Sequence, residues 1–275
     1  MEWSKIKNII LVILLAVNLI LLSVVGLQEY QSAQYDAQTL DSAVTLLASN
    51  GIAVATDLPQ AADLSILQME NDALDSQQQE AQVSALLGEI GLVDDSAGGT
   101  RVLYYGEKGM AELSSDGYFS FTLEAGALPA EEDRWAQGAA LLGQLGIQAT
   151  PAGESSQDGM ELMAYWQSWN GTPVFTCKSV VACQDGSVRS ISGQRLLGHT
   201  TPVSTQSLLT LPTVLVRFLN GMSQNGYVCS AITGLALGYS TTVSTNRLTP
   251  VWGVDTDAGR YYVNAVTGGF SRADE

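Results

Sequence analysis

The feature that most constrains this chain is an uncharged apolar run near its start. Residues 9–27 read IILVILLAVNLILLSVVGL and contain no Asp, Glu, Lys or Arg. As a helix, nineteen residues span about 28 Å, which is close to the hydrocarbon thickness of a bilayer. Because a bilayer offers no water to backbone amides, a single segment crosses it only as a helix. We therefore predict a transmembrane helix at 9–27.

Basic residues predict how this helix is oriented. Lys5 and Lys7 precede it, and no Lys or Arg follows until Arg101. The excess of positive charge on cytoplasmic flanks then places residues 1–8 in the cytoplasm and everything after 27 outside the cell. Trp3 fits the aromatic belt at the cytoplasmic headgroups. The sequence thus predicts a single-pass protein of the cell membrane with an extracellular C-terminal region.

A cleaved signal peptide is the alternative. Such peptides carry an apolar region of about 7 to 15 residues, followed by small residues at the cleavage site. The run here is longer, Val24-Val25-Gly26 only approximates a cleavage site, and no lipoprotein cysteine follows it. An uncleaved anchor is favoured, and cleavage after Gly26 stays open.

The charge of the chain excludes one class of partner. It carries 12 Lys plus Arg against 28 Asp plus Glu, a net charge of −16. A surface this negative repels phosphate backbones, so we expect no nucleic-acid partner.

The three cysteines and the single histidine predict neither a disulfide framework nor a metal site. Cys177 and Cys183 lie six residues apart in one expected strand, about 20 Å from each other, which is beyond disulfide reach. We expect buried free thiols, while pairing of Cys229 stays open. No Cys-x-x-Cys is present and His199 is the only histidine, so we expect no zinc site. No cofactor is predicted.

Helices are predicted where a short phrase recurs. LLASNGI at 46–52, LLGEIGL at 86–92 and LLGQLGI at 141–147 each close a stretch of helical periodicity with a glycine suited to a left-handed C-cap. A fourth helix, at about 205–220, is expected to end at Gly221.

Strands are predicted between these helices, where apolar residues alternate and Asp-Gly or Asn-Gly turns intervene. The expected strands are 101–105, 118–123, 162–169, 174–182, 188–196, 227–239, 248–255 and 261–266. Helices interspersed with antiparallel hairpins indicate an α+β fold. We expect a juxtamembrane link at 28–35, seams at 125–130 and 148–158, and three α+β units at 36–126, 127–200 and 201–275.

Three stretches carry a resemblance to a known family. EWSKIKNIILVILLAVNLIL at the start resembles the opening of YycI-type regulatory proteins, and LTPVWGVDTDAGRYYVNAVTGG at 248–269 is similar to that family's last hairpin. YWQSWNGTPVFTCKSVVACQDGSVRSISGQRL resembles its central strands and PepSY-like modules more widely. Glu2, where aspartate is usual, is a departure. The resemblance implies PepSY-like units of helices packed on antiparallel hairpins.

The resemblance also implies a function without catalysis. YycI-type proteins regulate the WalK-type (YycG) sensor histidine kinase, which controls cell-wall metabolism, together with the related YycH. The resemblance implies that the anchor packs against the kinase's membrane helices. Trp3, Lys5 and Lys7 would then fix the depth of the anchor, and Asn18 would be the polar member of its contact face. A carboxamide that bonds its own helix backbone is the alternative for Asn18. The sign of regulation stays open.

Other functions are weighed against structural explanations. A PepSY-like binding or inhibitory module, acting on a secreted peptidase or a wall ligand, is the alternative function. His199 alone could serve a hydrolase triad, but no nucleophile motif accompanies it. Asp255-x-Asp257-x-Gly259 resembles a calcium loop only partly, and a hairpin turn is favoured. Five aromatic residues could line a groove, although sheet packing is the commoner role: Trp166, Trp169, Trp252, Tyr261 and Tyr262.

Overall fold

The structure is a computed structural model of the chain. It describes residues 14, 18, 37–59, 64–70, 76–95, 98, 100–204, 206–242 and 246–273.

The described helices confirm most of the predicted ones. They are residues 37–49, α2 (Ser76–Leu87), α3 (Arg134–Gln144) and α4 (Leu211–Asn225). Gly51 and Gly146 follow the first and third of these helices with φ values of 81° and 76°, as expected for helix ends that need a left-handed residue. The predicted end of the second helix is wrong: α2 ends at Leu87, Gly88 follows it with φ 78°, and Ile90 and Gly91 lie in a strand.

The predicted end of the fourth helix is wrong. Gly221 lies inside α4 on its buried face, and the left-handed C-cap is Gly226, with φ 70°. Met222 is part of the same buried face. The apolar residue after Gly221 therefore continues the amphipathic pattern of the helix and does not fold back over its end.

The strands confirm the predicted hairpins and add others. The strands are β1 (Ala53–Val54), β2 (Ile66–Glu70), β3 (Ile90–Asp94), β4 (Arg101–Gly106), β5 (Gly109–Ser114), β6 (Tyr118–Leu123), β7 (Ala149–Gln157), β8 (Met160–Trp169), β9 (Thr172–Gln184), β10 (Ser187–Gln194), β11 (His199–Ser204), β12 (Ala231–Thr242), β13 (Arg247–Thr256), β14 (Gly259–Asn264) and β15 (Phe270–Arg272). The predicted turns at Gly117, Gly171 and Gly186 all have positive φ. The seam expected at 148–158 is wrong, because it forms β7.

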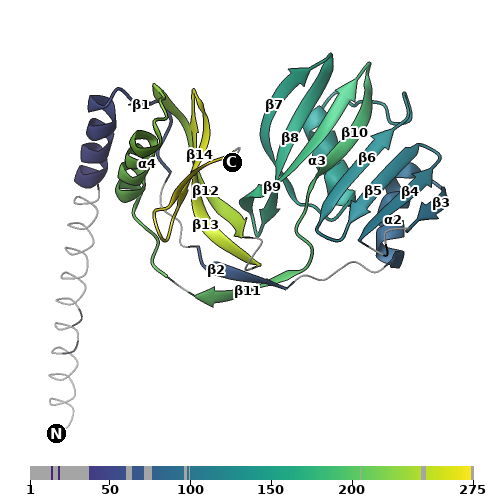
Figure 1. The fold of residues 1–275 in the computed structure, drawn as a ribbon, viewed down its shortest axis with the longest axis horizontal. Coiled ribbons are helices and arrows are strands. Elements are labelled where there is room, and N and C mark those ends of the chain that lie inside the picture. The colour runs from purple at the N-terminus through teal and green to yellow at the C-terminus, as the bar shows by residue number, and fades with distance from the viewer. Residues whose placement is uncertain are drawn as a thin grey trace, which may run out of the picture.

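The described strands join into one sheet that is shared by two lobes (Figure 1). The first lobe comprises the described residues of 37–70 and 199–273, and the second lobe comprises 76–194. The sheet runs in the order β11-β2-β13-β12-β9-β10-β6-β5-β4-β3. Tyr239 of β12 and Val174 of β9 are parallel register partners where the lobes meet.

The second lobe is inserted into the first. The strand β2 leads out of the first lobe and β11 leads back into it, and the two pair antiparallel. Their register places His199 directly opposite Glu70. The chain therefore leaves and re-enters the first lobe at one place, and all of 76–194 lies between these two points.

The hydrophobic cores follow the lobes and cross the predicted unit boundaries at 126/127 and 200/201. The core of the second lobe packs α2 and α3 on one sheet face and draws on both sides of 126, for example Phe121 and Leu142. The core of the first lobe joins Leu47 to Phe218 and Trp252. A third cluster, with Cys177 and Leu248, lies at the junction. Residues distant in sequence are combined because the sheet pairs them. The architecture is α+β, with helices on antiparallel hairpins.

Candidate functional site

The residues predicted to contact a partner in the membrane fall largely outside the described residues. Trp3, Lys5 and Lys7 are among those outside, as is most of 9–27. Asn18 is described: it is exposed and helical, and its Nδ2 donates to the carbonyl of Leu14 at 3.0 Å. This is the local bond given above as the alternative for Asn18. Within the described part of the chain, no helix combines the length and apolarity needed to cross a membrane.

His199 lies at the neck of the inserted lobe. Its Nε2 is 3.3 Å from Oε2 of Glu70, and both side chains are more than half exposed. An ion pair this exposed contributes little stability. His199 therefore lies where the start of β11 pairs with the end of β2.

Asp255 and Asp257 both bind protein groups. Asp255 pairs with Arg260, with Nε–Oδ1 at 2.5 Å and Nη2–Oδ2 at 2.6 Å. Asp257 accepts from the backbone N–H groups of Ser230 and Ala231. The Ser230 hydroxyl, which also donates to it, and these N–H groups lower the pKa of Asp257. The segment forms the hairpin turn favoured from sequence. Across the described ranges, no three His, Cys, Asp or Glu side chains are grouped so as to hold a metal ion.

The three cysteines are buried and free, as expected. Burial raises the pKa of all three thiols, and that of Cys177 to about 12. Buried thiols with raised pKa values are poor nucleophiles, because the thiolate is the reactive form.

The five aromatic residues divide between core and surface. Trp252 and Tyr261 are buried in the core of the first lobe, which confirms sheet packing for these two. Trp169 donates its Nε1 to the hydroxyl of Thr200 at 2.9 Å. Trp166 and Tyr262 line a cavity between the lobes. These two of the five aromatic residues therefore line a groove, which was the alternative to sheet packing.

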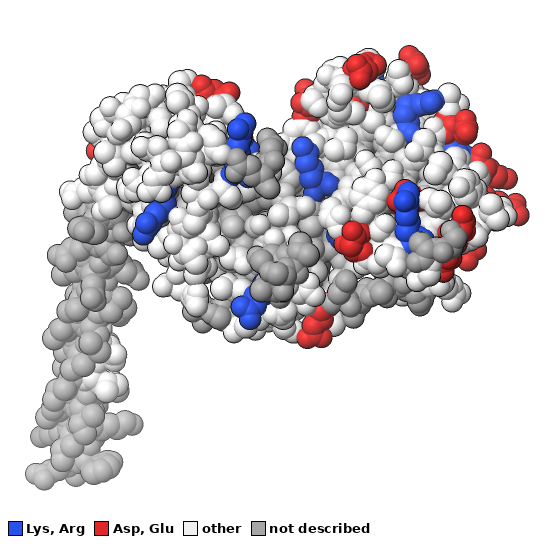
Figure 2. Space-filling view, viewed as in Figure 1, with Lys and Arg blue, Asp and Glu red and all other residues white. Residues whose placement is uncertain are grey.

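This cavity, the inter-lobe cleft, has a volume of about 650 Å³. One wall comes from β7, β8 and β9, and the other from β13 and β14. Figure 2 shows the notch between the lobes, with Lys and Arg side chains on both of its walls. In each lobe, helices cover the opposite face of the sheet. The cleft is therefore formed where the two helix-free faces meet.

The cleft collects positive charge over aromatic rings. The Arg260 guanidinium lies 4.9 Å from the ring centroid of Trp166 and 5.3 Å from that of Phe175. The ammonium of Lys178 lies 5.9 Å from the same Trp166 ring. Phe175 stacks on Tyr262, with centroids 5.5 Å apart. Such cation–π contacts hold both cations in place.

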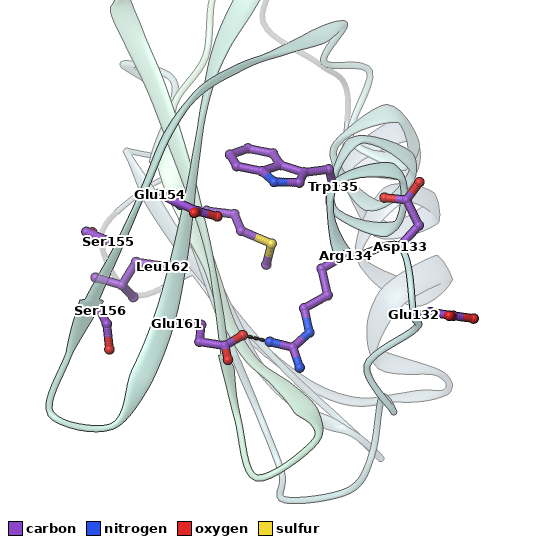
Figure 3. A pocket seen from close by; sticks show the side chains of 10 residues that line it. Glu132, Asp133, Arg134, Trp135, Glu154, Ser155, Ser156, Glu161 and Leu162 are labelled. Atoms are coloured by element: carbon purple, nitrogen blue, oxygen red, sulfur yellow. Dashed lines mark ion pairs between the residues drawn. The ribbon is translucent and has the colours of Figure 1, made fainter.

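A second cavity, of about 800 Å³, lies on the helix-covered side of the β7–β8 hairpin (Figure 3). We call it the acidic pocket. Its carboxylates belong to Glu132, Asp133, Glu154 and Glu161. Asp133 caps α3 by accepting from the N–H of Ala136 at 2.9 Å.

One cation lies among these carboxylates. Arg134 forms an ion pair with Glu161, and both side chains are substantially exposed. Figure 3 shows Glu154 extending from β7 into this pocket, toward Trp135.

Sequence reasoning missed the cations of the cleft. Lys178 and Arg260 lie 82 positions apart on strands of different lobes, and only the tertiary fold brings both to Trp166. The available signal was alternation along β9, which places Lys178 on the face opposite Val181 and Cys183.

Comparisons with known proteins find solved structures of low sequence identity. No family model and no curated protein matches the chain. The solved structure of an uncharacterized protein from Eubacterium rectale is 11% identical, with a TM-score of 0.49, and covers 77% of this chain and 86% of its own. The Bacillus megaterium YpeB C-terminal domain is 14% identical, with a TM-score of 0.43, and covers 73% of this chain and 98% of its own.

Proposed function

We propose that this protein is a membrane-anchored extracytoplasmic regulator of a WalK-type sensor histidine kinase, and that it acts by binding and not by catalysis. The observation that carries the proposal is the N-terminal motif, EWSKIK followed by an uncharged apolar run. The anchor at 9–27 packs against the kinase's membrane helices, and a YycH-type protein is the second partner.

The final hairpin supports the resemblance in a more limited way. In the 248–269 motif, Trp252, Tyr261 and Val263 are core residues of β13 and β14. Packing in the core is enough to explain why these residues resemble those of the family, and no contact with a partner is needed. The hairpin motif therefore supports a similar fold, and the N-terminal motif supports the proposed function.

Within the anchor, the local bond of Asn18 changes what this residue offers. One donor of the carboxamide is engaged with Leu14. A carboxamide has a second N–H and a carbonyl oxygen for a neighbouring helix. Hydrogen bonds between membrane helices contribute roughly 0.6 to 2 kcal/mol. Asn18 therefore contributes a small part of the free energy of helix association, and apolar packing contributes most of it.

The test replaces residues 9–27 with an unrelated transmembrane helix of equal length and reads a kinase-dependent reporter. We expect the reporter to lose its dependence on this protein, while Asn18→Leu shifts it only partly. The matched control keeps 9–27 and exchanges the link at 28–35. An unchanged reporter in a correctly inserted helix-swap variant would remove the membrane-contact mechanism.

A second candidate is a PepSY-like binding module for a secreted peptidase or a wall ligand. The inter-lobe cleft favours it, because it offers an open concave surface with aromatic and charged groups. Inhibition of a peptidase by a soluble fragment, 36–275, would support this candidate, since the fragment lacks the anchor.

A further inference from the structure

The strand β7 presents an open edge to the inter-lobe cleft. Among the described strands, β7 pairs only with β8. Four consecutive residues, 152–155, line the cleft. The register shifts between Pro151 and Gly153, but Glu154 and Ser155 lie in regular pairing after this bulge. Side chains of a strand alternate between two faces, so these two neighbours both line the cavity because the strand turns its edge toward it.

The ladder indicates which backbone groups this edge offers. The β7–β8 turn is Asp158-Gly159, with φ values of 51° and 77°. In such a two-residue turn the flanking residues, Gln157 and Met160, form a hydrogen-bonded pair, and bonded and non-bonded pairs then alternate. Glu154 and Ser156 therefore point their N–H and C=O groups away from β8. An extended chain can bond to such groups.

The charge inside the cleft indicates which charge an extended segment bound there should carry. Glu154 is the register partner of Met163, a core residue on the α3 side, so its carboxylate belongs to the acidic pocket. Arg260 is paired with Asp255. Lys178 is exposed, and no carboxylate of the described residues forms an ion pair with it. The cleft side chains thus carry one uncompensated positive charge.

We propose that the inter-lobe cleft binds an extended segment of a partner protein, which adds as a strand to β7 and places a carboxylate at Lys178. Trp166, Phe175 and Tyr262 provide the surface for the apolar side chains of that segment. The net charge of −16 repels a strongly acidic partner, so the segment carries a single carboxylate among uncharged residues. This site is separate from the anchor and gives the second candidate function a defined ligand.

The test uses the full-length chain in mild detergent and three fluorescein-labelled hexapeptide pools. All are acetylated and amidated, with Val and Thr alternating at the flanking positions, and they differ in one central residue: Glu, Gln or Lys. Fluorescence polarisation measures affinity. We expect the Glu pool to bind about tenfold more tightly than the Gln pool, as a hydrogen bond to a charged group predicts.

Variants separate the charge from the strand edge. Lys178→Met weakens the Glu pool about tenfold and leaves the Gln pool unchanged, while Lys178→Glu shifts the preference to the Lys pool. Glu154→Pro removes an edge N–H and weakens every pool, since proline has no donor. Glu154→Gln, the matched control, removes only a charge that faces the acidic pocket and binds as the unaltered chain does. Melting temperatures establish that each variant is folded.

Four outcomes overturn the proposal. The first is that no pool binds the unaltered chain. The second is that Lys178→Met and Glu154→Pro both bind like it. The third is a dimer that Glu154→Pro converts to monomer, which would assign the edge to a second copy. The fourth is competition by N-acetylglutamate amide as strong as by the hexapeptide, which would assign the cleft to a small carboxylate. All readouts are independent of the helix swap at 9–27.

Discussion

Phe270 of β15 packs directly onto Gly221 in the middle of α4. A Cβ atom at Gly221 would overlap the ring of Phe270 and would lie 2.7 Å from the Cβ of that residue. The close approach of helix and strand therefore depends on the missing side chain.

Gly221→Ala should destabilise the chain by roughly 2 kcal/mol, because the added methyl overpacks a closed core. This reverses the usual effect inside a helix, where alanine is more stable than glycine by about 1 kcal/mol. Urea unfolding measures the change.

Gly143→Ala in α3 is the matched control. No atom lies within 4 Å of a Cβ at Gly143, so we expect a gain of about 0.5 to 1 kcal/mol. Equal effects of the two substitutions would show that Phe270 yields to the methyl group.

Stability should fall in alkaline solution. Burial raises the pKa of Cys177 from 9.0 and that of Tyr165 from 10.0, each to about 12. Both groups are neutral when protonated, so their contribution is complete below pH 9. It is lost as the pH rises toward 12, because the unfolded chain ionises first.

The slope should approach about 1.4 kcal/mol per pH unit for each group. Urea unfolding of the chain and of Cys177→Ala between pH 8 and 11 checks this. The variant should be less stable at pH 8 and should show a shallower fall above pH 9. Parallel curves would rule out Cys177 as a source of the fall.

Arg195 is a buried cation that directly follows β10 and binds both helices of the second lobe. It is 5% exposed, and its Nη1 donates to Oε1 of Gln82 in α2 at 2.9 Å and to the carbonyl of Leu145 at the end of α3 at 3.0 Å. Arg195→Met should cost about 1 to 3 kcal/mol, because it leaves a buried carbonyl without its donor.

The exposed Arg101 offers a comparison, since it pairs with Glu112 at the surface. Arg101→Met should cost less than about 1 kcal/mol. Similar losses for the two variants in thermal unfolding would contradict a special role for burial at Arg195.

His199→Ala should leave stability within about 0.5 kcal/mol of the unaltered chain, because the pair with Glu70 is exposed. Any hydrolytic activity that the protein preparation shows should also remain. A loss of activity in a folded variant would reopen the hydrolase hypothesis for this residue.

Local features of the fold were predictable from the sequence. The helix ends at Gly51 and Gly146 and the turns at Gly117 and Gly171 depend on backbone conformations that neighbouring residues determine. Gly221 and β7 were misjudged for the opposite reason. The absence of a side chain at Gly221 serves a contact with Phe270, 49 positions later. The Gly, Pro and Ser residues of β7 resemble a linker and become a strand only through pairing with β8.

The candidate site was less predictable than the fold. Trp166 and Tyr262 stood out as aromatic residues of strands, but alternation alone does not separate a core face from a cleft wall. The pairing of β12 with β9 brings the two helix-free faces together, and no local pattern in either strand encodes that contact. Lys178 becomes part of a cleft only through this pairing.

The insertion of 76–194 into the first lobe determines the order in which the molecule can be built. The helix at 37–49 is made before the inserted lobe, yet its packing partners in α4 and β13 are made after that lobe. The inserted lobe has its partners close by in sequence and is complete by residue 194. During synthesis it can therefore fold before the C-terminal residues that cover Leu47 are present. A chain truncated before α4 would therefore combine a folded second lobe with an unfolded first lobe. We expect proteases to cleave such a chain within the first lobe.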